Sequence, residues 1–404
     1  ANEYFLFYIP GSESLQQSPG TTFLIKTPNP YEQSSYAFLN PDWEDAKQPT
    51  GSPVLRVDTV QPGGPSPGPG PWPVTDRGDC LITYEKELNN PIKSGREWLG
   101  EPFDVVNSRN FTLALPSYTT GDSCRIAVRV AIRSQGASSP LQLRLNGQDP
   151  ITVISPPVGT YYLDPYYNLK EEIWLADPGS SQLNLNAVFS RQNNAAQAWL
   201  DRILIQGRPR IQPDIWPASQ VFYNAFTMGP QPTLYRWPAS SQPYQIWDIT
   251  QPWEAAAYPL EDLQINGANY QQILVPGDKL RHLCFIKGNS FALPMSLTLI
   301  PNQHLMADSS ADMVIVTPKI FLTQAIQIAT SHEQHDGLKI NIVHPEDLYR
   351  EFSSGRRDLV AIRDYLRMLY HRRTPQSSTG PSLKYLLLLG STSYDALNVL
   401  PGNM

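Results

Sequence analysis

Three apolar runs with helical patterns between them begin at Asp312, and they constrain the fold of this 404-residue chain more than any other feature. The runs are Met313–Thr317, Leu338–Val343 and Leu383–Leu389. Buried parallel strands are almost continuously apolar, and they need crossover connections that are usually helices. The pattern therefore predicts the first strands of a parallel α/β sheet, with most of the sheet expected beyond Met404.

Sequence signals predict a helix in each of the two intervals between these runs. Thr317 is the expected cap of the first helix, with Pro318 at its first position and Gly337 at its end. The second helix is expected from Asp358 to Arg373. The predicted apolar faces comprise Phe321, Ala325, Ile328 and His332 in the first helix, and Ile362, Tyr365, Leu366 and Leu369 in the second.

The preceding part of the chain has the alternation that is typical of half-buried β-strands. The pattern is clearest in Arg125–Ile132 and Leu141–Leu145, and Leu183–Phe189 and Leu200–Ile205 make a further pair. Strands of this kind, separated by Gly, Pro and Asn turns, favour a two-sheet sandwich or jelly roll.

A second β-rich block follows the prolines after Arg208, with Tyr244–Ile249 and Leu280–Ile286 as its clearest strands. The predicted fold is therefore multi-domain, with β-sandwich-rich domains before the start of an α/β domain. The expected domains are a β-sandwich or jelly-roll-like domain in residues 1–208, a second β-rich domain in 209–300, and an incomplete α/β domain in 301–404.

Composition excludes several classes of function. The chain has 31 basic and 37 acidic residues, a net charge of −6, and no long basic run that could follow a phosphate backbone, so we expect no nucleic-acid partner. No stretch approaches the ~18 apolar residues of a membrane-spanning helix. No nucleotide-binding loop is present, so we expect no cofactor.

One loop of the α/β segment lies where such folds bind ligands. Gly390–Asp395 follows the most apolar run, and the carboxyl ends of strands are the usual place for ligands in these sheets. Asp395 could orient a catalytic group or bind a cation. The alternative is a plain turn after a buried strand.

The three cysteines, Cys80, Cys124 and Cys284, have no metal-ligand spacing. Cys80 and Cys124 either pair in an oxidising compartment or remain free. His282 and Cys284 lie on one face of a strand, as a catalytic dyad could, but their apolar neighbours favour an ordinary core position.

Three further segments each allow a functional and a structural interpretation. His332, Glu333 and His335 lack the HExxH spacing, so they are expected as surface residues at a helix end rather than as metal ligands. Arg96–Trp98 either forms a partner surface or stabilises a β domain. Pro62–Pro73 is expected to be an exposed loop rather than a polyproline ligand. No position is assigned as catalytic, cofactor-binding or metal-binding.

Several motifs occur together in an order that resembles one family, the gingipain-related cysteine peptidases that serve as sortases of the bacterial type IX secretion system. The most specific motifs are Ser94–Phe103 and Tyr349–Gly355. The others are Asn29–Tyr31, Ser35–Tyr36, Phe38–Leu39, Ile246–Ile249, Asn302–Leu305, Asp312–Val316, Asp358, Ala361–Asp364 and Met368–Tyr370.

The resemblance implies a cell-surface enzyme with a caspase- or gingipain-like catalytic fold, at the outer membrane of a Gram-negative bacterium. Its implied partners are an outer-membrane β-barrel anchor protein, cargo proteins with C-terminal sorting domains, and an anionic lipopolysaccharide to which cleaved cargo is joined. The family places its catalytic His and Cys after later strands, and neither pattern occurs before Met404. This chain alone is therefore expected to lack the dyad and to be inactive.

The second hypothesis is a non-catalytic β-sandwich module, such as a surface adhesin or a glycan- or peptide-binding domain. Its Trp and Tyr residues could provide stacking area for a ligand, or they could simply be core residues. Further coding sequence with a GHG-type motif and a later Cys would favour the enzyme.

Overall fold

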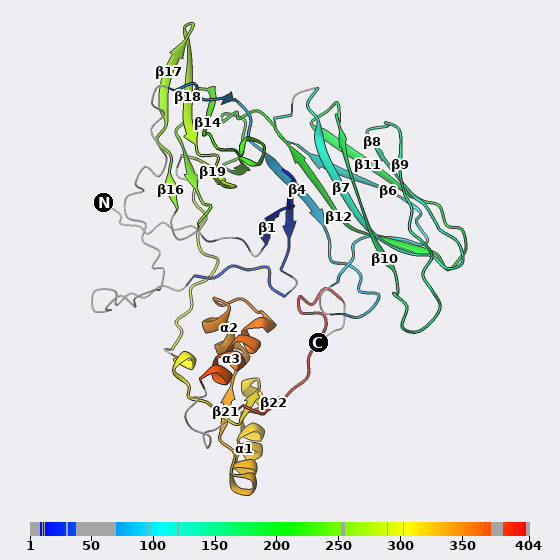
Figure 1. Ribbon diagram of the computed structural model, residues 1–404, viewed down its shortest axis with the longest axis vertical. Coiled ribbons are helices and arrows are strands. Elements are labelled where there is room, and N and C mark those ends of the chain that lie inside the picture. The colour runs from blue at the N-terminus through cyan, green and yellow to red at the C-terminus, as the bar shows by residue number, and fades with distance from the viewer. Residues whose placement is uncertain are drawn as a thin grey trace. The chain divides into compact units, whose positions relative to one another are not determined.

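The computed structural model describes residues 9, 11, 13–29, 31–37, 70–94, 97–115, 117–118, 121–251, 255–288, 290–301, 303–372 and 383–400 (Figure 1). Two compact units are present. The β unit comprises the described residues within 15–27 and 50–293, and the α/β unit comprises those within 9–14, 28–49 and 294–404. Each is described by itself. None of the described helices is long and apolar enough to cross a membrane.

The β unit begins with a sandwich of two antiparallel sheets, which we call the first sandwich (Figure 1). One sheet has the order β10 (Asn168–Ala176), β7 (Cys124–Arg133), β12 (Gln197–Gly207) and β4 (Cys80–Glu85), and β5 (Pro102–Phe103) also pairs with β12. The other sheet has the order β6 (Ser108–Ala114), β11 (Gln182–Phe189), β8 (Leu141–Leu145) and β9 (Ile151–Val153).

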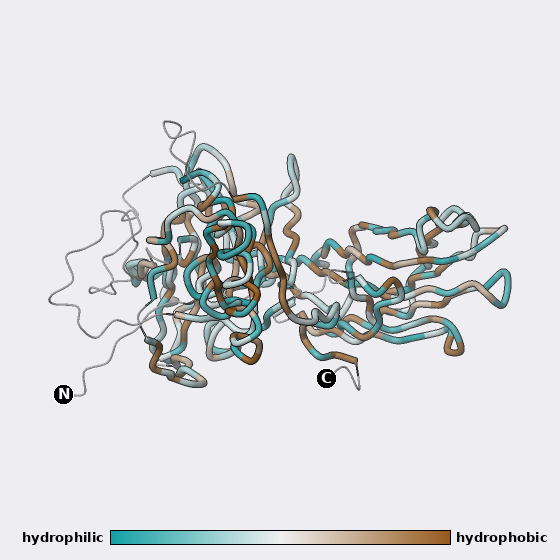
Figure 2. The backbone as a smooth tube through the Cα atoms, turned by 90° about the horizontal axis from the view of Figure 1, so that it is seen from below, coloured by the Kyte–Doolittle hydropathy of each residue, from teal (hydrophilic) through white to brown (hydrophobic). Residues whose placement is uncertain are grey.

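Alternation along the strands explains the core of this sandwich, and Figure 2 shows it as short hydrophobic and hydrophilic stretches that follow one another. In β8, Leu141, Leu143 and Leu145 are buried while the residues between them are exposed, because successive side chains point to opposite faces. Strand β12 is buried along nearly its whole length. Its outer face is covered, since Leu204 packs with Phe23, which immediately precedes strand β2 (Leu24–Thr27). Strand β2 pairs with β1 (Ser14–Gln17).

A second sandwich completes the β unit. Its sheets have the orders β13 (Ser219–Tyr223), β19 (His282–Lys287), β15 (Tyr244–Asp248), β16 (Ala256–Ala257), and β17 (Glu261–Ile265), β18 (Ala268–Val275), β14 (Thr233–Pro238), β3 (Val74–Thr75). Aromatic rings fill its core, including Trp216, Trp237 and Phe285. The indole Nε1 of Trp237 donates to the Tyr244 hydroxyl at 2.7 Å, so this buried donor is satisfied.

Asp79 connects the two sandwiches. Its backbone exchanges hydrogen bonds with Tyr223 of β13 at 3.0 and 2.8 Å. Its carboxylate accepts a hydrogen bond from the backbone N–H of Phe226, in the 3-10 helix η1 (Ala225–Thr227), at 2.8 Å and another from Arg208 Nε at 3.1 Å. Both oxygens of this buried side chain are therefore used, which ties the start of β4 to the second sandwich.

The α/β unit contains a parallel sheet with the strand order β21, β20, β22 among the described residues. Its elements are η3 (Leu305–Ala307), β20 (Met313–Val316), η4 (Lys319–Phe321), α1 (Leu322–Asp336), β21 (Ile340–Val343), α2 (Pro345–Phe352), α3 (Leu359–His371) and β22 (Tyr385–Leu388). The expected parallel strands joined by helices are confirmed, as is the overall class of β-sandwiches followed by an α/β segment.

Helices cover both faces of this sheet. Val314 and Val316 of β20 pack with Leu348 of α2 and Tyr365 of α3, whereas Ile315 packs on the other side with residues of α1. Strand β22 lies at an edge of the sheet, where Leu388 remains 53% exposed. An exposed apolar edge strand of this kind is an aggregation hazard, because its unpaired backbone groups can pair with another chain.

Two details of the first helix differ from the prediction. Thr317 does not cap it, because Pro318 has an extended conformation (φ −61°, ψ 150°) and η4 precedes α1. Phe321 is 38% exposed, and His332 is also solvent-exposed, so the buried face of α1 consists of Ala325 and Ala329 with Ile328 beside them. The end at Gly337 is confirmed, with φ at +64°.

The prediction for the second helix agrees with α3, where the Asp358 side chain caps the start by accepting from Val360 N at 2.8 Å. Arg373 lies outside the described residues. Helix α2 was not predicted. The domain boundaries after residues 208 and 300 stay a prediction.

Candidate functional site

The carboxyl ends of the three parallel strands meet at one edge of the sheet, where Thr317 has a central position. Its side-chain hydroxyl donates to the carbonyl of Leu389, beyond β22, at 3.1 Å. Its backbone N–H donates to the carbonyl of Val343, at the end of β21, at 3.0 Å. These contacts bring together the residues that follow all three strands, as parallel topology requires.

His344 is a candidate that the sequence analysis missed. It follows β21 directly, is half-buried, and its Nδ1 lies 2.8 Å from the carbonyl oxygen of Thr317. Because a carbonyl only accepts, Nδ1 carries the hydrogen and a neutral ring has its lone pair on Nε2. His344 therefore offers a proton acceptor at this edge. The sequence feature that could have indicated His344 is its position, followed by Pro345, immediately after an apolar strand.

The loop Gly390–Asp395 follows β22 at the same edge. Gly390 has φ at +145°, a backbone conformation that residues with a side chain rarely adopt, so this turn favours glycine. The buried Asp395 carboxylate accepts hydrogen bonds from the backbone N–H groups of Val399 and Leu400, both at 2.8 Å. Each bond uses one of the two carboxylate oxygens, so both oxygens already have backbone donors. This arrangement fits a structural turn better than a cation site.

The three cysteines are buried and free in the structure. Cys80 packs in the core of the second sandwich and Cys124 in the core of the first, so they do not form the disulfide that was considered. Burial raises the pKa of the thiols of Cys80 and Cys124 to about 12, and it also raises that of Cys284. None has the environment that produces a reactive thiolate.

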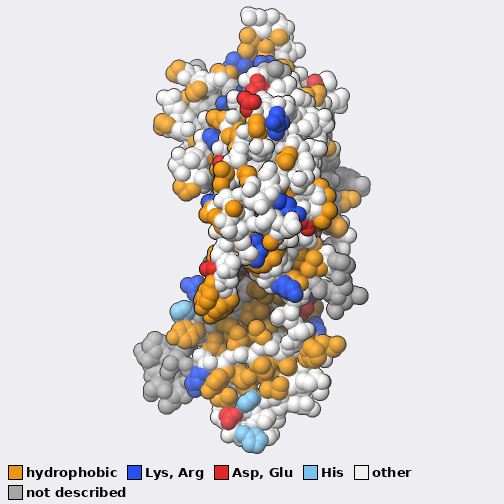
Figure 3. Space-filling model, turned by 90° about the vertical axis from the view of Figure 1, so that its right-hand side faces the viewer, with side chains coloured by type: hydrophobic (Ala, Val, Ile, Leu, Met, Phe, Trp, Pro, Cys, Tyr) orange, Lys and Arg blue, Asp and Glu red, His pale blue; other side chains and the backbone are white. Residues whose placement is uncertain are grey.

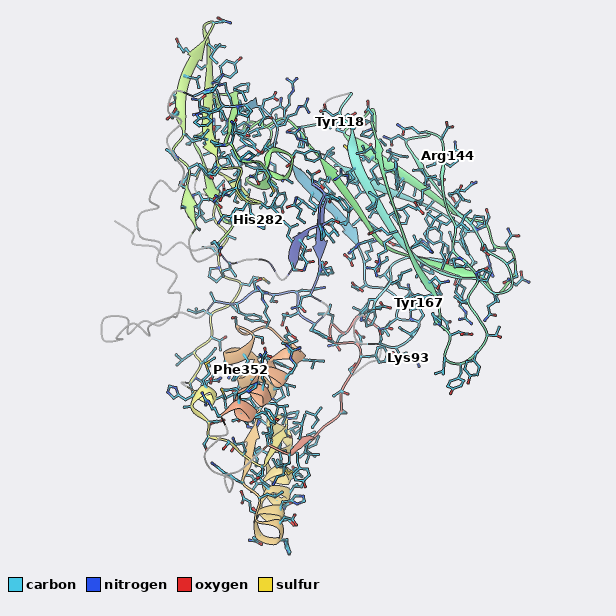
Figure 4. All side chains as sticks on the ribbon, viewed as in Figure 1. Lys93, Tyr118, Arg144, Tyr167, His282 and Phe352 are labelled. Carbon is cyan, nitrogen blue, oxygen red and sulfur yellow. The ribbon has the colours of Figure 1, made fainter. Side chains whose placement is uncertain are left out.

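His282 and Cys284 are separate core contacts and not a dyad. The imidazole of His282 meets the ring of Tyr223 edge-on, with 5.3 Å between centroids, and burial lowers its pKa. The Cys284 sulfur lies 3.6 Å from Ser219 Oγ and packs beside Trp247. Figure 4 shows where His282 lies on the β unit.

The cluster His332, Glu333 and His335 lies at the end of α1. Nδ1 of His332 lies 2.6 Å from the Asp336 carboxylate, and Nδ1 of His335 lies 2.8 Å from the carbonyl of Ser331. Within the parts of the chain that the structure describes, no group of three or more His, Cys, Asp and Glu side chains could hold a metal ion.

The other segments considered from the sequence are only partly described. In Arg96–Trp98, Arg96 lies outside the described residues, Glu97 accepts from the Tyr167 hydroxyl at 2.8 Å, and Trp98 is buried. In Pro62–Pro73, only residues 70–73 are described. Among the tryptophans that the structure describes, five are core residues, namely Trp98, Trp199, Trp216, Trp237 and Trp247.

Residues 306–404 match the model of the family described as Peptidase family C25. The structure of dimeric latent PorU from Porphyromonas gingivalis is similar over 97% of this chain, with a TM-score of 0.76 and 22% identity. The chain spans 36% of the length of that PorU chain. No curated protein sequence matches the chain.

Two other solved structures are similar over smaller parts of the chain. The CBM36-1 domain of a multidomain xylanase from the hindgut metagenome of Trinervitermes trinervoides has 14% identity and a TM-score of 0.23, covering 31% of this chain and 95% of its own. The Cry4Aa toxin from Bacillus thuringiensis has 14% identity and a TM-score of 0.21, covering 26% of this chain and 18% of its own.

The PorU match extends over nearly the whole chain, from the β-sandwiches to the parallel sheet, whereas the family model covers the α/β segment. Both agree with the resemblance found in the sequence motifs. The chain thus has the fold of the amino-terminal part of a PorU-like protein, with a partial C25 peptidase region in residues 306–404.

Proposed function

We propose that this chain is the amino-terminal part of a type IX secretion sortase, a cysteine endopeptidase and transpeptidase at the cell surface. It would act on cargo proteins with C-terminal sorting domains and join the cleaved cargo to an anionic lipopolysaccharide. The observation that carries the proposal is the PorU-like fold over 97% of the chain, which includes a C25 segment. An outer-membrane β-barrel anchor protein is the proposed partner.

The reaction needs a thiolate and two nucleophilic steps. The thiolate attacks the scissile carbonyl, the amide bond breaks, and the sorting domain leaves with a protonated amino end, so that cargo remains as a thioester. An amine of the acceptor then attacks the thioester, forms a new amide bond and releases the thiol. A bound amine competes with water because its effective molarity is high.

This chain contributes the scaffold of that chemistry rather than its nucleophile. Residues 306–404 contain no cysteine, and the three cysteines elsewhere are buried with raised thiol pKa values. Strands β20, β21 and β22 would form the start of the catalytic sheet. His344 and Gly390–Asp395 would lie at the edge to which later strands add their catalytic groups.

The test is deletion of the gene in the source bacterium, followed by mass spectrometry of the carboxyl ends of secreted cargo. We expect cargo to retain its sorting domain and to lose its attachment to lipopolysaccharide, and a plasmid copy of the gene should restore both. Normal cargo ends and normal attachment in the deletion strain would instead favour the alternative of a non-catalytic surface adhesin or binding module.

A further inference from the structure

The outer face of the sheet β6, β11, β8, β9 in the first sandwich is rich in amide side chains. The inward residues of these strands are apolar, including Leu143 and Leu185, whereas the outward ones are polar. The face includes Asn110, Thr112, Arg144, Asn184 and Asn186. In Figure 3 the side of the molecule that carries β8 and β9 faces the viewer, and the upper part, which is β unit, has few acidic side chains.

Hydrogen bonds hold several of these side chains in place. Asn186 lies opposite Asn110 and donates from Nδ2 to its Oδ1 at 2.8 Å. Asn184 lies opposite Thr112 and accepts from its hydroxyl at 2.8 Å. Asn110 and Asn184 each use the side-chain oxygen as acceptor in these bonds. The side-chain NH₂ group of each therefore has no protein partner among the described residues. The face is therefore ordered before a ligand arrives, which reduces the entropy cost of binding.

A turn at Asn146 and Gly147 closes one end of a groove on this face. Asn146 Nδ2 donates to the carbonyl of Pro178 at 2.6 Å, and its Oδ1 accepts from the backbone N–H of Asn184 at 2.7 Å. The groove is open, has a volume of about 560 Å³, and is lined by Asn110, Arg144, Asn146, Gly147, Pro178, Ser180, Gln182, Asn184 and Asn186.

Charge distinguishes this groove from an ordinary polar surface. Arg144 is exposed, and its guanidinium has no ion pair or hydrogen bond with any described residue. No Asp or Glu is among the lining residues. Figure 4 shows Arg144 on the outer side of the first sandwich. A free guanidinium can bind a carboxylate with two parallel hydrogen bonds, and the neighbouring amides can donate to and accept from hydroxyl groups. The groove is therefore complementary to a ligand in which hydroxyl groups surround one carboxylate.

Other classes of ligand fit less well. The lining has no aromatic or large aliphatic side chain, so it offers no anchor for a hydrophobic peptide. One cation is too few to follow a nucleic-acid backbone. We infer that this groove binds an oligosaccharide that carries acidic sugar units, with Arg144 on the carboxylate and Asn110, Gln182 and Asn184 on neighbouring hydroxyls. The binding needs neither a catalytic domain nor cargo cleavage, so it can be tested independently of the proposed function.

The experiment is fluorescence anisotropy of labelled hexagalacturonate titrated with the full 404-residue chain, with labelled maltohexaose as the neutral probe. We expect hexagalacturonate to bind, maltohexaose to bind at least about tenfold more weakly, and added salt to weaken the acidic probe only. Arg144→Ala should lower affinity for hexagalacturonate about tenfold or more, and Arg144→Lys should lower it less. Asn184→Ala should lower affinity for both probes.

Two variants serve as matched controls. Gln142→Ala removes an exposed amide from the same face but outside the groove, and Lys279→Ala removes one exposed positive charge from the second sandwich. Both should bind like the unchanged chain, and thermal unfolding should show that Arg144→Ala is folded. Absence of binding to hexagalacturonate, equal binding of the two probes, or an affinity that Arg144→Ala leaves unchanged would overturn the inference.

Discussion

Two glutamates of the first sandwich are expected to make the β unit less stable as pH rises. Glu85 ends β4, Glu87 follows it, and Oε2 of each is buried without a hydrogen-bond partner among the described residues. Burial, followed by the negative charge of Asp201, raises the pKa of both carboxyls to about 7. Arg202, opposite Glu85 on β12, and Arg129 pull the pKa of Glu85 the other way but do not prevail.

The sign follows from proton binding. The pKa of each carboxyl is higher in the folded chain than its ordinary value of 4.5, so the folded state binds more protons between pH 4.5 and about 7. The free energy of unfolding therefore has its full contribution from these groups below about pH 4.5 and loses it as pH rises through 7. At ~1.36 kcal/mol per pKa unit, each carboxyl can change the free energy of unfolding by at most ~3.4 kcal/mol over this pH range. Both carboxyls keep some solvent contact, so we expect ~1–2 kcal/mol each after screening.

The assay is urea unfolding of the unchanged chain and of Glu85→Gln at pH 5 and pH 8. Gln keeps the shape of a protonated Glu, so Glu85→Gln should be close to the unchanged chain at pH 5 and more stable by ~1–2 kcal/mol at pH 8. Glu172→Gln, at a half-buried position on β10 without an ion pair to any described residue, is the matched control and should change stability by less than ~0.5 kcal/mol at both pH values. An equal effect of Glu85→Gln at both pH values, or a loss of stability at pH 8, would refute the reasoning.

Three further substitutions test the packing described above. Asp358→Ala removes the α3 cap and should lower the free energy of unfolding by ~1 kcal/mol in urea, whereas Asp364→Ala, beyond the cap, should cost less than ~0.5 kcal/mol. Tyr244→Phe leaves the buried Trp237 N–H without its acceptor and should lower stability by ~1–3 kcal/mol, while a similar loss in the exposed control Tyr161→Phe would contradict the role of that bond. Leu388→Lys should reduce concentration-dependent association of residues 1–404 in sedimentation velocity, since it places a charge on the exposed edge of β22, and unchanged association would exclude this edge as the cause.

Periodicity predicted the elements whose burial is regular. Strands such as β8 and β11 were predictable because alternate residues are buried, and β20 because all four of its residues are. Helix α2 was missed because it has only eight residues and a single buried side chain, Leu348, so its pattern is too short to recognise. Thr317 was misassigned as a cap because the sequence did not indicate the extended conformation of Pro318.

The sites depend on contacts that sequence spacing does not encode. Thr317 and His344 meet because parallel strands end at the same edge, although 27 positions separate them. Asn110 and Asn186 lie 76 positions apart and form a pair only through the register of β6 and β11. The family motifs indicated the PorU-like fold, but they did not indicate this polar face.

The most direct test of the account is to label the intact source protein with a thiol-reactive cargo peptide and then map the modified peptide by mass spectrometry. The account predicts one labelled cysteine that lies outside residues 1–404 and a parallel loss of cargo cleavage. Cys80, Cys124 and Cys284 should react only after unfolding, because all three are buried. Labelling of one of these three in the folded protein with loss of cleavage, or cleavage that persists when no cysteine can react, would contradict it.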